Sequence, residues 1–182
     1  TETLGGAVTH TAISGIADYK FSTEEECLDH IKKIMATLGH QIRSAGFDRI
    51  SPAAPAKEMQ DIYGLIPADP SHPYDMLEII NRLVDAPGIG QFKEDYGKTI
   101  ICGYASNAGW AVGIVANQRT VVKTKQGEVT LGGVIYNDSA DKTARFIMNC
   151  NQKKIPLVFI QDVTGFMVGS RSEQAGIIKD GA

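Results

Sequence analysis

The sequence shows no excess of basic residues and no long apolar run. Its 182 residues include 18 Lys and Arg against 21 Asp and Glu, a formal net charge of −3. A nucleic-acid-binding domain normally carries a basic surface, so this balance argues against a nucleic-acid partner. No stretch approaches the roughly 18 consecutive apolar residues of a membrane-spanning helix, so we predict no transmembrane segment.

Cysteines are few, and the common catalytic motifs are missing. Cys27, Cys102 and Cys150 form no C-x-x-C pair. This favours reduced thiols in a cytoplasmic protein over a disulfide framework or a metal site. The sequence also lacks a G-x-S-x-G elbow and a P-loop, and Gly88 and Gly90 have no third glycine for a dinucleotide motif. The lack of a clear nucleophile or acid–base pair favours catalysis by backbone dipoles.

What the sequence does contain is ample material for a hydrophobic core. Apolar residues make up 43% of the chain and charged residues 21%.

The sequence begins at Thr1 without an initiator methionine and stops at Ala182, just after a helical pattern has begun. We therefore expect an internal piece of a longer polypeptide.

A helix is predicted near the start of the chain. Ser22 and Glu25 have the spacing of a capping box, in which each side chain accepts the exposed N–H of the other residue. Apolar residues then recur at helical spacing, which predicts a helix over residues 23–38 with one buried face. They are Cys27, Leu28, Ile31, Ile34, Met35 and Leu38. His30 and His40 have no partners at metal-ligand spacing and are expected at the surface.

Proline and alanine residues mark a boundary after this helix. Residues 51–56 form a Pro/Ala segment, and Pro67, Pro70 and Pro73 interrupt a second irregular stretch. We therefore predict three parts. They are residues 1–50 as the tail of one domain, 51–73 as a connector and 74–182 as the first part of a second domain.

The second domain is predicted to be α/β. Apolar runs at residues 99–104 and 110–115 predict two strands, and a polar excursion at 123–128 predicts a hairpin. A helix over residues 140–152, capped by Asp138 or Ser139, then leads into a further strand. This order predicts that the helix connects two strands of one sheet.

The most informative segment is the strand and loop from residue 155 to 170. Leu157–Ile160 is a continuous apolar run, which predicts a strand buried on both faces. The following loop carries Thr164, Gly165 and Gly169, where ligands of α/β proteins bind. Glycine lets backbone N–H groups approach a ligand, and two such groups aimed at one oxygen form an oxyanion hole. The alternative is an ordinary strand-to-helix turn.

Asp162 stands at the end of this strand, where an α/β enzyme could place a catalytic acid. Its side chain could equally accept hydrogen bonds from the loop that follows. We interpret Asp162 as a cap of the loop rather than as a catalytic group.

Several segments, taken in order, match one protein family. They are Gly5–Ala7 with Thr9 and His10, Tyr74–Asp75, Arg82–Asp85, Tyr96–Gly97, Val112–Asn117, Ile155–Val158, Thr164–Gly169 and Gly176–Ala182. Together they resemble the carboxyltransferase subunits of biotin-dependent acyl-CoA carboxylases and decarboxylases, in the crotonase superfamily. The resemblance covers the whole chain. It implies an α/β, crotonase (ClpP)-like fold, with the end of an N-terminal half and the start of a C-terminal half.

The resemblance also implies where the reaction occurs. In this family the N-terminal half of one subunit binds acyl-CoA and faces the C-terminal half of another, which receives the biotin of a separate carrier protein. We therefore expect a homo-oligomer, at least a dimer. Paired backbone N–H groups stabilise negative charge on the thioester and on the biotin ureido group.

Particular residues take roles under this resemblance. The step from Gly165 to Phe166 places a backbone N–H, that of Phe166, at the biotin-side oxyanion hole. The neighbours that would contact the substrate are Thr164, Met167, Val168 and Gly169. The family's second donor lies beyond Ala182 and its acyl-CoA glycines lie before Thr1, so we expect the isolated chain to be inactive.

Within the family, three segments most resemble the α subunit of glutaconyl-CoA decarboxylase. They are residues 61–70, 123–133 and 151–158. This implies transfer of a carboxyl group from glutaconyl-CoA to carrier-bound biotin, giving crotonyl-CoA, with a membrane partner that exports sodium. The alternatives are a methylcrotonyl- or propionyl-CoA carboxylase subunit, or a non-catalytic assembly module.

Overall fold

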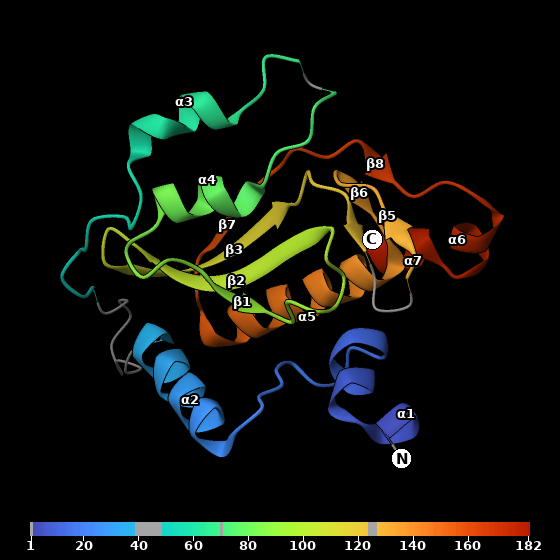
Figure 1. Ribbon diagram of the computed structural model, residues 1–182, viewed down its shortest axis with the longest axis horizontal. Coiled ribbons are helices and arrows are strands. Elements are labelled where there is room, and N and C mark those ends of the chain that lie inside the picture. Colours follow the sequence, from blue (N-terminus) through green and yellow to red (C-terminus); the bar gives the residue numbers. More distant parts are fainter. Residues whose placement is uncertain (1, 39–48, 70, 124–126) are drawn as a thin grey trace.

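The fold is built on a four-stranded sheet with helices on both faces (Figure 1). The computed structural model describes residues 2–38, 49–69, 71–123 and 127–182. The helical elements are α1 (Glu2–Gly5), the π-helical η1 (Thr9–Ile13), α2 (Glu24–Leu38), the 3₁₀-helical η2 (Met59–Asp61), α3 (Ile62–Leu65), α4 (Met76–Leu83), α5 (Asn137–Lys153), α6 (Ser170–Gln174) and α7 (Ile177–Gly181). The strands are β1 (Gly90–Phe92), β2 (Ile100–Asn107), β3 (Trp110–Asn117), β4 (Val122–Lys123), β5 (Val129–Thr130), β6 (Val134–Ile135), β7 (Leu157–Ile160) and β8 (Gly165–Phe166).

Strands β2 and β3 form the centre of the sheet, whose order is β1-β2-β3-β7. β1, β2 and β3 pair antiparallel, and β7 runs parallel to β3. β2 and β3 contain most of the two strands predicted at residues 99–104 and 110–115. Helix α5 precedes β7 and contains the helix predicted over residues 140–152. The predicted α/β arrangement is therefore confirmed. β4 and β5 also pair antiparallel, as the predicted hairpin requires, although its tip at 124–126 lies outside the described residues.

Apolar side chains pack on both faces of the sheet. On one face Ile101 packs in a cluster with Ile80 of α4, and on the other Cys102 packs with Val115 and with Phe146 of α5. Neighbouring residues of β2 enter different clusters because side chains alternate between the two faces of a strand. Figure 1 shows α4 and α5 on opposite sides of the sheet.

Strand β7 is not buried on both faces, so that prediction is wrong. Its central residues Val158 and Phe159 are 41% and 52% exposed. Within the described chain β7 pairs along one edge only, with β3, because it is the last strand of the sheet. A continuous apolar run indicates that a strand can be buried on both faces. The position of the strand within its sheet decides how much of it is buried.

The turn between β2 and β3 is held by a buried carboxylate. Ala108 and Gly109 have positive φ of 50° and 82°, which a two-residue hairpin turn requires. Asp85 Oδ1 accepts the Ala108 N–H (2.9 Å), and Oδ2 accepts the Gly109 N–H (2.7 Å) and the Ser106 hydroxyl (3.1 Å). Burial acts to raise the pKa of Asp85, but these hydrogen bonds hold it below its ordinary value.

Helix α5 begins three residues before its predicted start. Ser139 Oγ accepts the N–H of Tyr136 at 2.9 Å, so Ser139 caps the helix from within its first turn. The prediction that Asp138 or Ser139 precedes the helix is therefore wrong in position. At the other end Lys154 has a left-handed φ of 59°, which turns the chain toward β7.

Lys142 of α5 is a buried cation, 2% exposed. Its Nζ donates to the carbonyl oxygens of Tyr96 (2.9 Å) and Gly97 (3.3 Å). Burial lowers the pKa of Lys142 to about 8, although the neighbouring Cys102 and Asp138 act in the opposite direction. Part of the Lys142 population is therefore neutral near physiological pH.

We expect Lys142 to contribute a rise in the free energy of unfolding between pH 8 and pH 10. The folded pKa of about 8 lies below the ordinary value of 10.5, so the unfolded chain binds more protons at Lys142 between these values. The contribution of Lys142 to the free energy of unfolding therefore rises with pH in this window, by about 3 kcal/mol over the full shift, and is constant below pH 8. Urea denaturation at several pH values below 10 measures the slope, and Lys142→Met should remove it. An unchanged slope in that variant would contradict the assignment.

Helix α2 is observed, but its cap is displaced by one residue. The Glu26 N–H donates to Thr23 Oγ1 (3.2 Å), and Glu26 Oε2 accepts the Ser22 N–H (3.0 Å). The predicted pair of Ser22 and Glu25 is therefore wrong. A Ser-Thr pair followed by consecutive glutamates permits two capping registers, and only the backbone geometry selects one of them.

The predicted buried face of α2 is also wrong in part. Three of its apolar residues are exposed, namely Leu28 (52%), Ile31 (51%) and Met35 (60%). The helix instead turns His30 inward, where its ring packs against Tyr19 and Phe21 with centroid separations of 4.2 and 5.0 Å. His30 is therefore not the surface residue that was predicted, and His40 lies outside the described residues.

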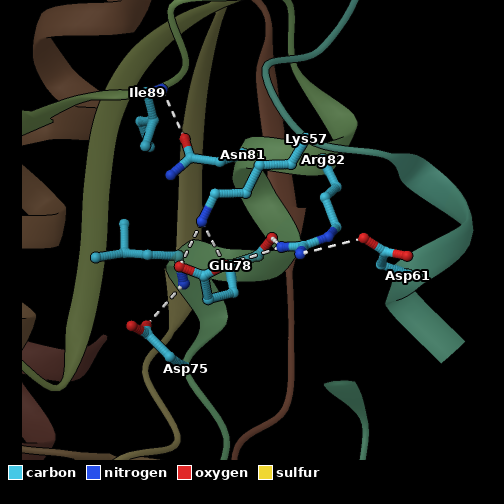
Figure 2. A network of polar contacts seen from close by, with 8 residues as sticks. Lys57, Asp61, Asp75, Glu78, Asn81, Arg82 and Ile89 are labelled. Carbon is cyan, nitrogen blue, oxygen red and sulfur yellow. Dashed lines mark hydrogen bonds and ion pairs between the residues drawn. The ribbon is translucent and has the colours of Figure 1, made fainter. Parts of the chain in front are cut away.

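The N-terminal segment and the connector both attach to the sheet domain. The buried Lys93 donates to the carbonyl of Gly15 and pairs with Asp18 at 2.6 Å. Figure 2 shows the contacts of the connector with α4, in which Glu78 accepts Lys57 Nζ (2.6 and 2.7 Å) and Arg82 Nη1 (2.9 Å). The division into residues 1–50, 51–73 and 74–182 stays a prediction. None of the helices in the described chain is both long and apolar enough to cross a membrane.

Candidate functional site

The predicted oxyanion loop forms a short strand beside β6. The Thr164 N–H donates to the Gly133 carbonyl (2.7 Å), and β8 then pairs in parallel with β6. Gly165 has a φ of 151°, in a region that residues with a side chain rarely adopt. A Cβ on Gly165 would meet no atom within 4 Å, so conformation rather than space requires glycine there.

The predicted role of the Phe166 N–H as a donor stays a prediction. The next N–H along the chain, that of Met167, donates to the Ile135 carbonyl of β6 at 2.8 Å. The Thr164 N–H, three positions earlier, donates to the same segment at 133–135, so the regular alternation of N–H groups along a strand is broken between Thr164 and Met167. The Phe166 ring lies against Gly181 and is 39% exposed.

A cleft of about 710 Å³ adjoins this loop. Of the residues predicted to contact substrate, Met167, Val168 and Gly169 line it and Thr164 does not, and neither do Gly165 and Phe166 of β8. The other walls come from segments that sequence reasoning did not assign to a site. They are residues 12–13, 95–99, the β5 hairpin at 128–130, the start of α5 at 136–138 with Asp141, and residues 170–172 with Ala175.

Charges along the cleft are largely paired. Arg171 binds Glu128 at 2.9 Å, and Lys98 lies 3.6 Å from Asp95. Burial raises the pKa of Asp138, and burial together with the charge of Asp180 raises that of Asp141. Among the described residues that line the cleft, Lys98 and Arg171 thus each have an acidic partner.

Thr99 brings an unsatisfied hydroxyl to the cleft. The residue is 2% exposed, and its Oγ1 is a buried polar atom without a hydrogen-bond partner in the described structure. A buried hydroxyl without a partner costs about 1–3 kcal/mol, so such an atom needs an explanation.

We expect Thr99→Val to stabilise the ligand-free protein by about 1 kcal/mol, because an isosteric methyl group replaces the unsatisfied hydroxyl. Thermal unfolding of the two proteins measures the difference. Thr143→Val is the matched control, because the Thr143 hydroxyl donates to the Ser139 carbonyl at 2.7 Å and its loss should not stabilise. A destabilised Thr99→Val protein would show that the hydroxyl already has a partner.

Asp162 does not cap the loop, so that interpretation is wrong. Its carboxylate accepts the Tyr74 hydroxyl at 2.6 Å and lies 3.2 Å from Arg119 Nε. Burial raises the pKa of Tyr74 to about 12, and its hydrogen bond to Asp162 acts in the same direction. Tyr74 therefore remains a donor throughout the neutral range. No local motif predicts this contact, because its partners are 88 positions apart.

The arrangement can polarise a carbonyl or ureido oxygen through backbone N–H groups, which act strongly where water is excluded. Across the described ranges, no group of three or more His, Cys, Asp or Glu residues could hold a metal ion.

Comparison with known proteins finds one family over the whole chain. The family model described as "Carboxyl transferase domain" matches residues 1–182. The mitochondrial methylcrotonoyl-CoA carboxylase beta chain of Dictyostelium discoideum is 38% identical over all of this chain and 28% of its own length. The propionyl-CoA carboxylase beta chain of Roseobacter denitrificans is 36% identical over all of this chain and 34% of its own length. The chain thus spans about a third of the length of these curated relatives.

A solved structure agrees as well. The transcarboxylase 12S structure, described as a hexamer with methylmalonyl-coenzyme A bound, superposes with a TM-score of 0.83 and 29% identity. The superposition covers 99% of this chain and 33% of that protein. The expected crotonase-like fold class is confirmed. The relatives carry the names of acyl-CoA carboxylase subunits, which supports the alternative prediction better than glutaconyl-CoA decarboxylase. With its whole length matched, the chain belongs to the carboxyl transferase domain family.

Proposed function

We propose that the chain is the biotin-side part of a carboxyltransferase that moves a carboxyl group between carrier-bound biotin and an acyl-CoA. The observation that carries the proposal is the glycine-rich loop, which starts at Gly165 with a φ of 151° and continues through Met167, Val168 and Gly169 in the wall of the cleft. A fixed N–H donor stabilises charge that develops on an oxygen during transfer.

The cleft fits the bicyclic urea of biotin in size and in chemistry. Its volume of about 710 Å³ lies in the usual range for small-molecule sites. Val129, Met167 and Val168 supply apolar wall, and polar side chains such as Tyr136 and Asn137 also line the cleft. Bound biotin would supply a nitrogen that carries the carboxyl group. The chain's own groups would orient the ring and exclude water.

For the acyl-CoA we propose a carboxylase substrate of the methylcrotonyl or propionyl type, because both relatives described above carry such names. Glutaconyl-CoA is the second candidate, supported by the three segments noted in the sequence. The sodium-exporting membrane partner belongs to that candidate alone. A biotin carrier protein as partner and a cytoplasmic location are part of both proposals.

We also propose that the working protein is a homo-oligomer. The transcarboxylase 12S relative is described as a hexamer. The family resemblance implies that an acyl-CoA half from another subunit faces this half. An isolated copy of these 182 residues should therefore bind biotin weakly and show no transfer.

The test is a carboxyl-transfer assay on the full-length protein with free biotin. Methylcrotonyl-, propionyl- and glutaconyl-CoA are compared as substrates, with the carboxylated form used where transfer to biotin is measured. Turnover with methylcrotonyl- or propionyl-CoA supports the leading proposal. Crotonyl-CoA formed only from glutaconyl-CoA in the presence of biotin would replace it with the decarboxylase. No turnover with any acyl-CoA would favour a non-catalytic assembly module.

A further inference from the structure

We propose that Tyr74, Arg119 and Asp162 are positioning residues that set the backbone orientation of the loop carrying the Phe166 donor. The inference rests on the proposed function, because it concerns the same loop. None of the three is among the residues that line the cleft in the described structure. Their effect on transfer would therefore pass through the main chain rather than through contact with the substrate.

Asp162 fixes the chain where it leaves β7. Its N–H donates to Asn117 Oδ1 (3.3 Å), and its carboxylate accepts the Tyr74 hydroxyl (2.6 Å) and pairs with Arg119 (3.2 Å). These partners come from the end of β3 and from the segment just before α4. Three separate stretches of backbone thus meet at one carboxylate, two residues before Thr164.

Arg119 fixes the strand on the other side of the loop. Its guanidinium lies against Gly133 in space that a Cβ would occupy, and a Cβ there would also approach Thr164 Oγ1 (3.4 Å). The Gly133 N–H donates to the Gln118 carbonyl (2.7 Å), and the Gly133 carbonyl accepts the Thr164 N–H (2.7 Å). Arg119 therefore connects both strands that hold the start of the oxyanion loop.

These contacts link the position of Thr164 to the orientation of the Phe166 peptide. Thr164 and Met167 both donate to the segment at 133–135, so a shift of Thr164 would change the backbone between them, which includes the Phe166 N–H. A misplacement of about 1 Å in a reacting group lowers a rate by roughly a hundredfold. Loss of a positioning contact should therefore lower kcat while leaving the KM for substrate nearly unchanged.

The experiment compares Asp162→Asn and Tyr74→Phe with the full-length wild-type protein. Asp162→Asn removes the ion pair with little change of shape, and Tyr74→Phe removes only the hydroxyl. We expect kcat for transfer to free biotin to fall about tenfold in each, with KM within about twofold. Hydrogen exchange of the amides from Thr164 to Met167 should become faster in both variants.

Matched controls lie on the surface. Asp29→Asn breaks an exposed ion pair to Lys32, and Tyr63→Phe removes the hydroxyl of a residue that is 91% exposed. Neither should change kcat or exchange in the loop. Arg119→Lys keeps the charge opposite Asp162 and should retain more activity than Arg119→Met. Thermal unfolding confirms that each variant is folded. If Asp162→Asn does not fold, Tyr74→Phe still tests the positioning role.

The outcomes separate this inference from the proposed function. Unchanged kcat and unchanged loop exchange in both variants would overturn the positioning role. A raised KM with unchanged kcat would also overturn it, because it would indicate direct contact with the substrate. If the wild-type protein transfers no carboxyl group, the proposed function fails, and the exchange rates alone still decide whether the three residues hold the loop.

Discussion

Replacing Gly165 by alanine in the full-length protein is expected to lower the rate of carboxyl transfer by about a hundredfold or more. Removal of one oxyanion-hole donor typically costs that much in other enzymes. Gly165 has a φ of 151°, which alanine adopts only with strain, so the Gly165–Phe166 peptide would rotate. This rotation would turn the Phe166 N–H away from its native direction. Steady-state transfer to free biotin measures the effect.

Two comparisons make the Gly165 result specific. Gly64→Ala adds the same methyl group on α3, where nothing lies within 4 Å and φ is not in the positive range, and should leave transfer unchanged. Phe166→Leu alters the ring that packs against Gly181 but keeps the N–H, so its effect on rate should be much smaller. Equal losses for Phe166→Leu and Gly165→Ala would point to general damage rather than to a lost donor. Full activity of Gly165→Ala would show that the oxyanion loop lies elsewhere.

Replacing Phe146 by alanine is expected to lower the free energy of unfolding by about 3–5 kcal/mol. The ring is fully buried and packs against Phe92 and Tyr104, with centroid separations of 5.5 and 5.0 Å. It also fills the space above Gly113, where a Cβ would approach the ring to 3.3 Å. Alanine leaves a cavity between α5 and the sheet that the strands cannot close. Both the lost contacts and the cavity contribute.

Hydrogen exchange of the α5 amides in the full-length protein measures the loss of stability in Phe146→Ala at the helix itself. Met148→Ala on the same helix is the matched control, because Met148 is 64% exposed and its truncation should change stability by less than about 0.5 kcal/mol. Similar changes in the two variants would contradict the packing described for α5. Loss of transfer in Phe146→Ala without loss of stability would contradict it as well.

Local sequence patterns predicted the elements that depend on neighbours in the chain. The apolar runs of β2 and β3 and the helical spacing of apolar residues in α5 placed these elements within a few residues, because each pattern depends on a short segment of the chain. The glycine-rich loop was placed for the same reason, since Gly165 and Gly169 both take φ values that other residues avoid. Its catalytic role remains a prediction.

The sequence by itself determined the α/β order, the positions of β2 and β3, and the position of the loop after β7. Only the tertiary structure decided that β7 is an edge strand, that His30 packs against Tyr19, and that Asp162 binds Tyr74 and Arg119. The physical reason is the distance along the sequence over which each interaction acts. Caps, periodicity and turns act over a few residues, whereas Asp162 and Tyr74 meet across 88 positions, and that contact exists only once the sheet and α4 have packed.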